Sequence, residues 1–199
     1  MTLGERTGRG RSIAERSLER WTEKLGEPEN LEDLLTLRLS HATWDPFVSE
    51  TLMIEPSEEA VTEGLKSAEV VAADVGMVAA GIRRSVERLG LETVIASEVG
   101  ERIPEDTVTG DGMRKILEDH RNVAVVVGNA PTAAEKVAEY PESIAVAVLF
   151  PVGIGAMEAK RAAMDAGIPV VTNVSVRGGT PLAVAAFNAL ADCVTGNAP

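Results

Sequence analysis

Residues 123–132 read Val-Ala-Val-Val-Val-Gly-Asn-Ala-Pro-Thr, a short apolar run that is followed at once by a glycine turn and a proline. Four valines in five residues are typical of a strand that is buried on both faces. Proline is favoured in the first turn of a helix, so residues 131–139 are predicted to form one. A buried strand that passes through a turn into a helix is the repeating unit of a parallel α/β sheet.

The same alternation continues on both sides of this segment. Further strands are predicted at residues 70–73, 93–97, 144–150 and 169–172. Further helices are predicted at residues 78–89, 109–120, 156–166 and 181–193. Consecutive units of this kind predict an α/β fold, doubly wound, with a mainly parallel sheet that is flanked by helices on both faces.

The first part of the chain follows a different pattern. Residues 1–30 are predicted to form an N-terminal arm with a frayed start and one helix over residues 12–25, capped by Ser12. Residues 31–199 are expected to form a single α/β domain. Its first elements are a helix over 31–39, a loop or irregular strand over 40–46, and a helix over 57–66.

Composition and charge narrow the class of protein. The 199 residues carry a net charge of −12, which argues against binding to nucleic acid or to an anionic membrane surface. No apolar stretch approaches the length of a membrane span. One cysteine and two histidines indicate a cytoplasmic protein without an internal disulfide or a metal site. The acidity fits simple solubility, and a high-salt habitat stays open beside it.

Glycine turns follow several of the predicted strands, at the sheet edge where doubly wound folds bind ligands. Residues 128–132 and 177–181 each open a helix, where backbone N–H groups and the helix dipole favour an anion. Arg177 adds a positive charge to the second turn. Residues 153–155 lack the third glycine of a dinucleotide fingerprint. These turns indicate an anionic ligand, with a tight connection that binds nothing as the alternative.

His41 is the strongest candidate for acid–base chemistry. It lies in the polar stretch Ser-His-Ala-Thr-Trp-Asp-Pro, and histidine is the side chain that exchanges protons near neutral pH. A capping or surface histidine is the alternative reading. His120 closes a predicted helix and is interpreted as structural. Arg38, three residues before His41, faces either the same cleft or solvent.

Taken together, these segments resemble the precorrin-8X methylmutase family, also called cobalt-precorrin-8 methylmutases. Val-Val-Val-Gly-Asn-Ala-Pro-Thr at 125–132, Pro-Val-Gly-Ile-Gly-Ala-Met-Glu-Ala-Lys at 151–160 and Arg-Gly-Gly-Thr-Pro at 177–181 are similar to three turns of the family in their order. Residues 38–43 and 74–82 are similar to its histidine segment and to a further conserved pattern. The resemblance spans roughly residues 31–192.

The resemblance implies an isomerase of cobalamin biosynthesis that moves a methyl group from C11 to C12 of precorrin-8X or cobalt-precorrin-8. The product would be hydrogenobyrinate or cobyrinate, no cofactor or metal on the protein is required, and a homodimer is expected. His41 would be the catalytic proton donor to this carboxylate-rich ring. The expected substrate-binding residues are Arg38, Thr43, Asp74, Met77, Gly128, Asn129, Ala130, Thr132, Gly153, Arg177, Gly178, Gly179 and Thr180.

Two other readings remain open on the sequence alone. The chain has Thr109-Gly110-Asp111 where the family carries a Thr-Arg pair, which favours a non-catalytic corrinoid-binding or carrier protein on the same fold. A more distant alternative is an unrelated small-molecule isomerase. Whether the ring already holds cobalt is also open.

Overall fold

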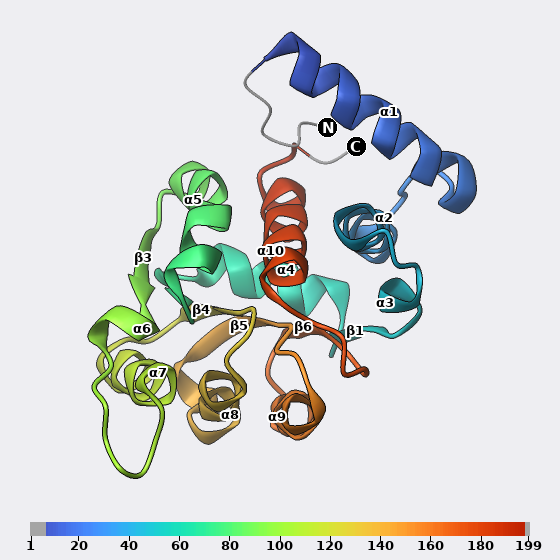
Figure 1. Cartoon of the computed structure of the whole chain (residues 1–199). Helices are drawn as coiled ribbons and strands as arrows, with labels where there is room; N and C mark the ends of the chain where they lie inside the picture. Colours follow the sequence, from blue (N-terminus) through green and yellow to red (C-terminus); the bar gives the residue numbers. More distant parts are fainter. Residues whose placement is uncertain (1–6, 198–199) are drawn as a thin grey trace.

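The computed structural model describes residues 7–197, which form one six-stranded sheet covered by helices on both faces (Figure 1). The strands are β1 (Leu52–Glu55), β2 (Val70–Ala73), β3 (Glu92–Ile95), β4 (Val123–Val127), β5 (Ile144–Leu149) and β6 (Val170–Asn173). The helices are α1 (Gly8–Leu25), α2 (Leu31–Thr43), α3 (Phe47–Glu50), α4 (Glu58–Ser67), α5 (Gly76–Leu89), α6 (Ala96–Val99), α7 (Val108–Asp119), α8 (Pro131–Glu139), η1 (Pro141–Ser143), α9 (Ile154–Asp165) and α10 (Thr180–Val194).

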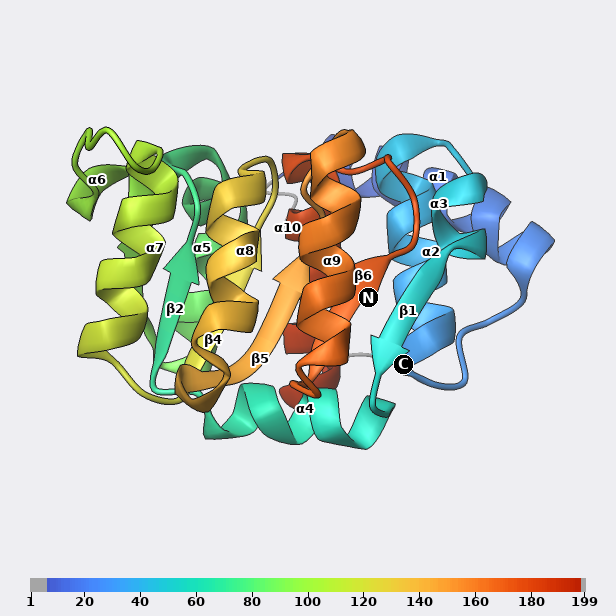
Figure 2. The same cartoon turned by 90° about the horizontal axis from the view of Figure 1, so that it is seen from below.

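The sheet has the strand order β1-β6-β5-β4-β2-β3, and only β1 runs antiparallel to its neighbour. The predicted α/β class and the mainly parallel sheet are therefore confirmed. In Figure 2 the arrows of β2 and β5 point to the same edge, opposite to β1, and because β2 to β6 are parallel their carboxyl ends lie together there. The turns that follow β2, β4, β5 and β6 meet at this edge.

Each face of the sheet has its own apolar core. Neighbouring strand residues point to opposite faces, so Val126 packs with α2, α4, α5 and α10, while Val125 packs with α7, α8 and α9. Both valines are fully buried, as expected for a strand that is covered on both sides. Figure 1 shows the resulting layers, with α5 and α10 above the sheet and α7, α8 and α9 below it.

The first 60 residues differ most from the sequence prediction. Helix α1 begins at Gly8, where Thr7 accepts a hydrogen bond from the Gly10 N–H, and not at Ser12. The predicted frayed start falls partly on residues 1–6, which lie outside the described residues. Strand β1 at the sheet edge was not predicted. The division of the chain at residue 30 stays a prediction, although residues 26–30 do separate α1 from α2.

Residues 40–43 were predicted as loop or irregular strand, and this prediction is wrong, because α2 continues to Thr43. A proline restricts only the residue directly before it, so Pro46 constrains Asp45 and leaves residues 40–43 free to stay helical. The helix ends at Trp44, which adopts a left-handed conformation with φ 56° and donates its N–H to the Ser40 carbonyl. His41 therefore lies on the last turn of a helix.

Candidate functional site

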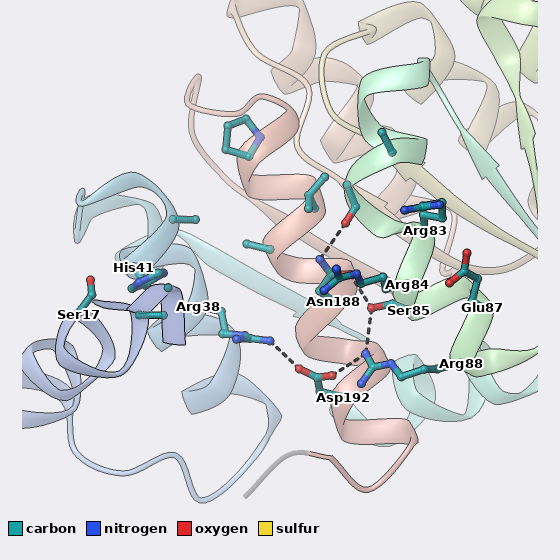
Figure 3. A pocket seen from close by; sticks show the side chains of 18 of the residues that line it. Ser17, Arg38, His41, Arg83, Arg84, Ser85, Glu87, Arg88, Asn188 and Asp192 are labelled. Carbon is teal, nitrogen blue, oxygen red and sulfur yellow. Dashed lines mark hydrogen bonds and ion pairs between the residues drawn. The ribbon is translucent and has the colours of Figure 1, made fainter. Parts of the chain in front are cut away.

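A cleft of about 1140 Å³ runs along α10 (Figure 3). Its floor is the exposed side of α10 from Pro181 to Asp192, one wall is α5, and the other wall is α2 with α1 behind it. Pro181 lies in the first turn of α10, just beyond the carboxyl end of β6, so the cleft begins at the edge where ligands of doubly wound folds bind.

His41 and Arg38 line this cleft from α2. They are three residues apart on a helix, which places both side chains on the same helical face. His41 is half-buried, and Figure 3 shows its ring on the wall opposite α5. The prediction that Arg38 faces a cleft shared with His41 thus agrees with the structure, and the solvent-facing alternative does not.

A buried ion-pair network ties the three main elements of the cleft together. The Asp192 carboxylate on α10 accepts a hydrogen bond of 2.6 Å from Arg38 on α2 and one of 2.7 Å from Arg88 on α5. Arg38 and Asp192 have side chains that are only 5% and 6% exposed. Removing one partner of such a pair leaves an uncompensated buried charge and costs about 3–5 kcal/mol. Asp192 therefore fixes Arg38, and with it the wall that carries His41.

A second contact between α5 and α10 completes the floor. The Ser85 hydroxyl donates to Asn188 Oδ1 at 2.6 Å, and Arg88 donates to Ser85 at 3.0 Å. The sequence reading missed Asn188 and Asp192. Their signal is a polar pair spaced by four residues in an otherwise apolar helix, a spacing that puts both on one side.

The turn after β4 is closed by Asp74, which follows β2. Its buried carboxylate accepts hydrogen bonds of 2.9–3.2 Å from the amide groups of Gly128, Asn129 and Ala130, and a further one from Val75. Burial raises the pKa of the Asp74 carboxyl, while these four N–H groups act in the opposite direction. The N–H groups of Gly128, Asn129 and Ala130, which were expected to help hold a substrate carboxylate, thus already bind a carboxylate of the chain itself, and this part of the prediction is corrected; substrate contact at Thr132 stays a prediction.

The turn after β6 is closed by Lys160 of α9. Its buried ammonium donates to Asn173 Oδ1 at 2.7 Å and to the carbonyls of Ser175 and Arg177 at 2.9 and 3.1 Å. Burial lowers the pKa of Lys160 to about 8. Three acceptors arranged around one ammonium group hold the backbone of residues 173–177 in place.

Arg177 lies on the far side of the same turn. Its Nε donates to Asp45 at 2.7 Å, and its guanidinium group lies 4.3 Å from the centre of the Phe47 ring. The side chain therefore links the turn to the segment between α2 and α3. It does not line the cleft that contains His41.

The remaining predicted residues lie at the turns or beside them. Thr43 donates to the Leu39 carbonyl, Thr132 shares a hydrogen bond of 2.6 Å with Thr107, and Met77 is 70% exposed at the start of α5. Gly153 and Gly179 have φ values of 103° and 110°, which a side chain would strain. Of all the predicted site residues, the structure brings only His41 and Arg38 into the cleft.

Among residues 7–197, no group of three or more His, Cys, Asp or Glu side chains is placed so that it could hold a metal ion. In the same part of the chain, no helix is long and apolar enough to cross a membrane.

Comparison with known proteins connects this geometry to a family. The family model of precorrin-8X methylmutase matches residues 12–193. The chain is 33% identical to a cobalt-precorrin-8 methylmutase of Methanothermobacter thermautotrophicus, over 94% of this chain and 95% of that protein. It is 33% identical to a precorrin-8X methylmutase of Pseudomonas aeruginosa, over 83% and 86% of the two chains. The solved structure of the Thermus thermophilus precorrin-8X methylmutase superposes with a TM-score of 0.81, at 28% identity and over 94% and 98% of the chains. This chain belongs to the precorrin-8X methylmutase family.

Proposed function

We propose that the protein is an isomerase of cobalamin biosynthesis that moves a methyl group from C11 to C12 of precorrin-8X or cobalt-precorrin-8, giving hydrogenobyrinate or cobyrinate. The observation that carries this proposal is the position of His41 in a cleft of about 1140 Å³, in a chain that belongs to the family. Similar relatives are named as enzymes for both the metal-free and the cobalt-bearing ring, which favours the isomerase over a carrier protein.

His41 is the proton donor in this proposal. As an imidazolium it protonates the macrocycle next to the migrating centre, the protonated ring accepts the methyl shift, and a proton is then released. General acid help of this kind contributes about 10²–10⁴-fold to a rate. Arg38 touches no reacting atom in this scheme. It is a positioning residue, because its ion pair with Asp192 fixes the wall of the cleft one helical turn from His41.

The turn at Gly178–Thr180 is the part of the predicted carboxylate site that the proposal keeps. Gly179 donates its N–H to the Phe150 carbonyl, whereas Thr180 begins α10, whose next residue, Pro181, lines the cleft. Pro181 has no N–H, and Leu182 and Ala183 donate to the Gly179 carbonyl, so the Thr180 N–H is the group at this helix start that would meet an anion. A carboxylate at the edge of the ring would meet this helix start.

A homodimer and a cytoplasmic location are further parts of the proposal. Four apolar side chains, Val152, Ile154, Val174 and Val176, are 40–86% exposed on two neighbouring turns. Contiguous exposed apolar surface of this kind marks protein interaction sites, and twofold dimers are the commonest oligomers. Cys193 is a free cysteine, and a chain with a single cysteine fits a reducing compartment.

The test is a comparison of His41→Ala with the wild type, using His120→Ala as the matched control. His120 is exposed at the end of α7 and does not line the cleft. We expect kcat on precorrin-8X to fall by about 10²–10⁴-fold in His41→Ala, because the general acid is lost, with an unchanged unfolding midpoint. His120→Ala should keep full activity.

Binding separates catalysis from recognition. The wild type and both variants are titrated with hydrogenobyrinic acid and with cobyrinic acid while the visible spectrum is recorded. We expect a spectral change in the wild type that is lost in His41→Ala, although the ring still binds. If the wild type binds neither ring, the proposed function is wrong; if it binds them but does not turn over precorrin-8X, the carrier alternative holds.

A further inference from the structure

The cleft is positively charged in a protein that is strongly acidic overall. Four arginines line it, Arg38, Arg83, Arg84 and Arg88, and only two carboxylates, Glu87 and Asp192. The whole chain has a net charge of −12, so the cleft reverses the sign of its surroundings. A concave site lined by one sign of charge concentrates ligands of the opposite sign.

These arginines are engaged to different degrees. Asp192 already holds Arg38 and Arg88 at 2.6 and 2.7 Å. Arg83, in contrast, forms no hydrogen bond or ion pair with any residue between 7 and 197, although it is exposed and lines the cleft. Arg84 is exposed on the same wall and lines the cleft, and Figure 3 shows it extending from α5 toward Asn188.

The wall that carries Arg83 and Arg84 is held at a defined distance from the floor. Gly81 lies against Val184 of α10 so closely that an added Cβ atom would come within 2.5 Å of a Val184 methyl group. The contact of Ser85 with Asn188 is a second such point. Helix α5 is therefore fixed against α10 by one residue before and one residue after Arg83 and Arg84. In Figure 3 the two arginines and His41 lie on opposite walls, with α10 between them.

We infer that Arg83 and Arg84 bind carboxylates at the rim of the ring while His41 acts from the facing wall. This inference rests on the proposed function and specifies which residues recognise its acidic substrate. A guanidinium group presents a planar pair of N–H donors that matches a carboxylate. Both arginines are set apart from His41 across the cleft, so they contribute to binding in the ground and transition states alike. Their loss should raise KM and leave kcat nearly unchanged.

The test uses the double variant Arg83→Gln/Arg84→Gln, with Arg161→Glu on the exposed side of α9 as the control, because this single change also lowers the net charge by two. The probes are hydrogenobyrinic acid and the same ring with every carboxylate methyl-esterified. We expect the double variant to bind the acid more weakly by on the order of ten-fold or more and with a flatter salt dependence, since a hydrogen bond to a charged group is lost. The affinity for the ester should be unchanged.

The outcomes are distinguishable from those that test the reaction itself. Equal binding of the acid by wild type and double variant, or equal losses for acid and ester, would overturn the inference while leaving the isomerase proposal intact. A fall in kcat without a rise in KM would also contradict it. Failure of the wild type to bind either probe would reject the proposed function, and the inference with it. The single variants Arg83→Lys and Arg84→Lys, which keep the charge, should recover part of the affinity.

Discussion

The turns at the carboxyl ends of the strands and the cleft beside α10 both gather polar side chains, but they use them in opposite ways. In the turns, Asp74 and Lys160 each satisfy several backbone groups of the chain itself. In the cleft, Asp192 holds Arg38 and Arg88, and beside this network His41, Arg83 and Arg84 line a large open space. From this difference we expect the turn after β4 and residues 173–177 to act as scaffold, while the helices and the turn at Gly178–Thr180 contact the substrate.

The largest expected effect is on stability, from Asp74→Ala. Without its carboxylate, the amides of Gly128, Asn129 and Ala130 lose their acceptor. We expect the free energy of unfolding to fall by about 3 kcal/mol, because an unsatisfied buried donor such as the Gly128 N–H costs about 1–3 kcal/mol and the half-buried bonds of Asn129 and Ala130 add less. Urea denaturation measures this. Asp119→Asn, at the exposed end of α7, is the control and should change it by less than about 0.5 kcal/mol. A small effect of Asp74→Ala on the free energy of unfolding would contradict the scaffold role of the turn after β4.

Lys160→Met should destabilise the protein by about 2 kcal/mol, since the side chain keeps its length but three buried acceptors lose their donor. Thermal unfolding gives the shift in the midpoint. If residues 173–177 are scaffold, the affinity of the folded variant for hydrogenobyrinic acid should change far less than that of the Arg83→Gln/Arg84→Gln variant. The reverse ranking would assign ligand binding to the turn.

Asp111 offers a pH test of a third closed network. The Glu101 N–H, Arg114 and Lys115 hold the pKa of its carboxyl well below the ordinary value of 3.8. A carboxyl whose pKa is lowered on folding stabilises the protein above its unfolded pKa, and this contribution is lost as the pH falls. The difference in unfolding free energy between wild type and Asp111→Asn should therefore be largest near neutral pH and shrink below about pH 4. A difference that is independent of pH would contradict this.

The smallest expected effect comes from Arg177→Gln. Its ion pair with Asp45 is exposed, and such pairs contribute about 0–1 kcal/mol. A double-mutant cycle with Asp45→Asn measures the coupling. Because Arg177 does not line the cleft, the affinity for hydrogenobyrinic acid should stay within about two-fold of the wild type. A ten-fold loss of affinity would show that Arg177 contributes to substrate binding, and the contrast between turns and cleft would then be weaker.

Much of the fold could be predicted because its signals are local. Strands β2 and β4 and helix α8 were predicted with the bounds that they have, since each is a short valine-rich run or begins with a marked proline. Strand β1 was missed because a short edge strand, Leu-Met-Ile-Glu, is too brief to show a period. The end of α2 was misplaced because packing of buried residues such as Leu39 overrides the polar sequence that follows it.

The site was predictable only in part, for a physical reason. His41 and Arg38 stand out by residue type and by their spacing on one helix. Asp192, Arg83 and Arg84 line the same cleft only because α10 and α5 pack beside α2. The spacing of Asn188 and Asp192 shows one polar side of α10, but local spacing does not show its contacts with Arg38 and Arg88, about 100–150 residues away. In the same way, nothing local shows that the amides after β4 are already occupied by Asp74.

The most direct test of the contrast between turns and cleft is a crystal structure of the protein with hydrogenobyrinic acid bound. We predict that the ring lies in the cleft along α10, with the His41 imidazole in contact with the macrocycle, carboxylates against Arg83 and Arg84, and the hydrogen bonds of Asp74 to Gly128, Asn129 and Ala130 intact. A ring seated on the turns after β4 and β6, with the cleft empty and the Asp74 contacts broken, would contradict the account.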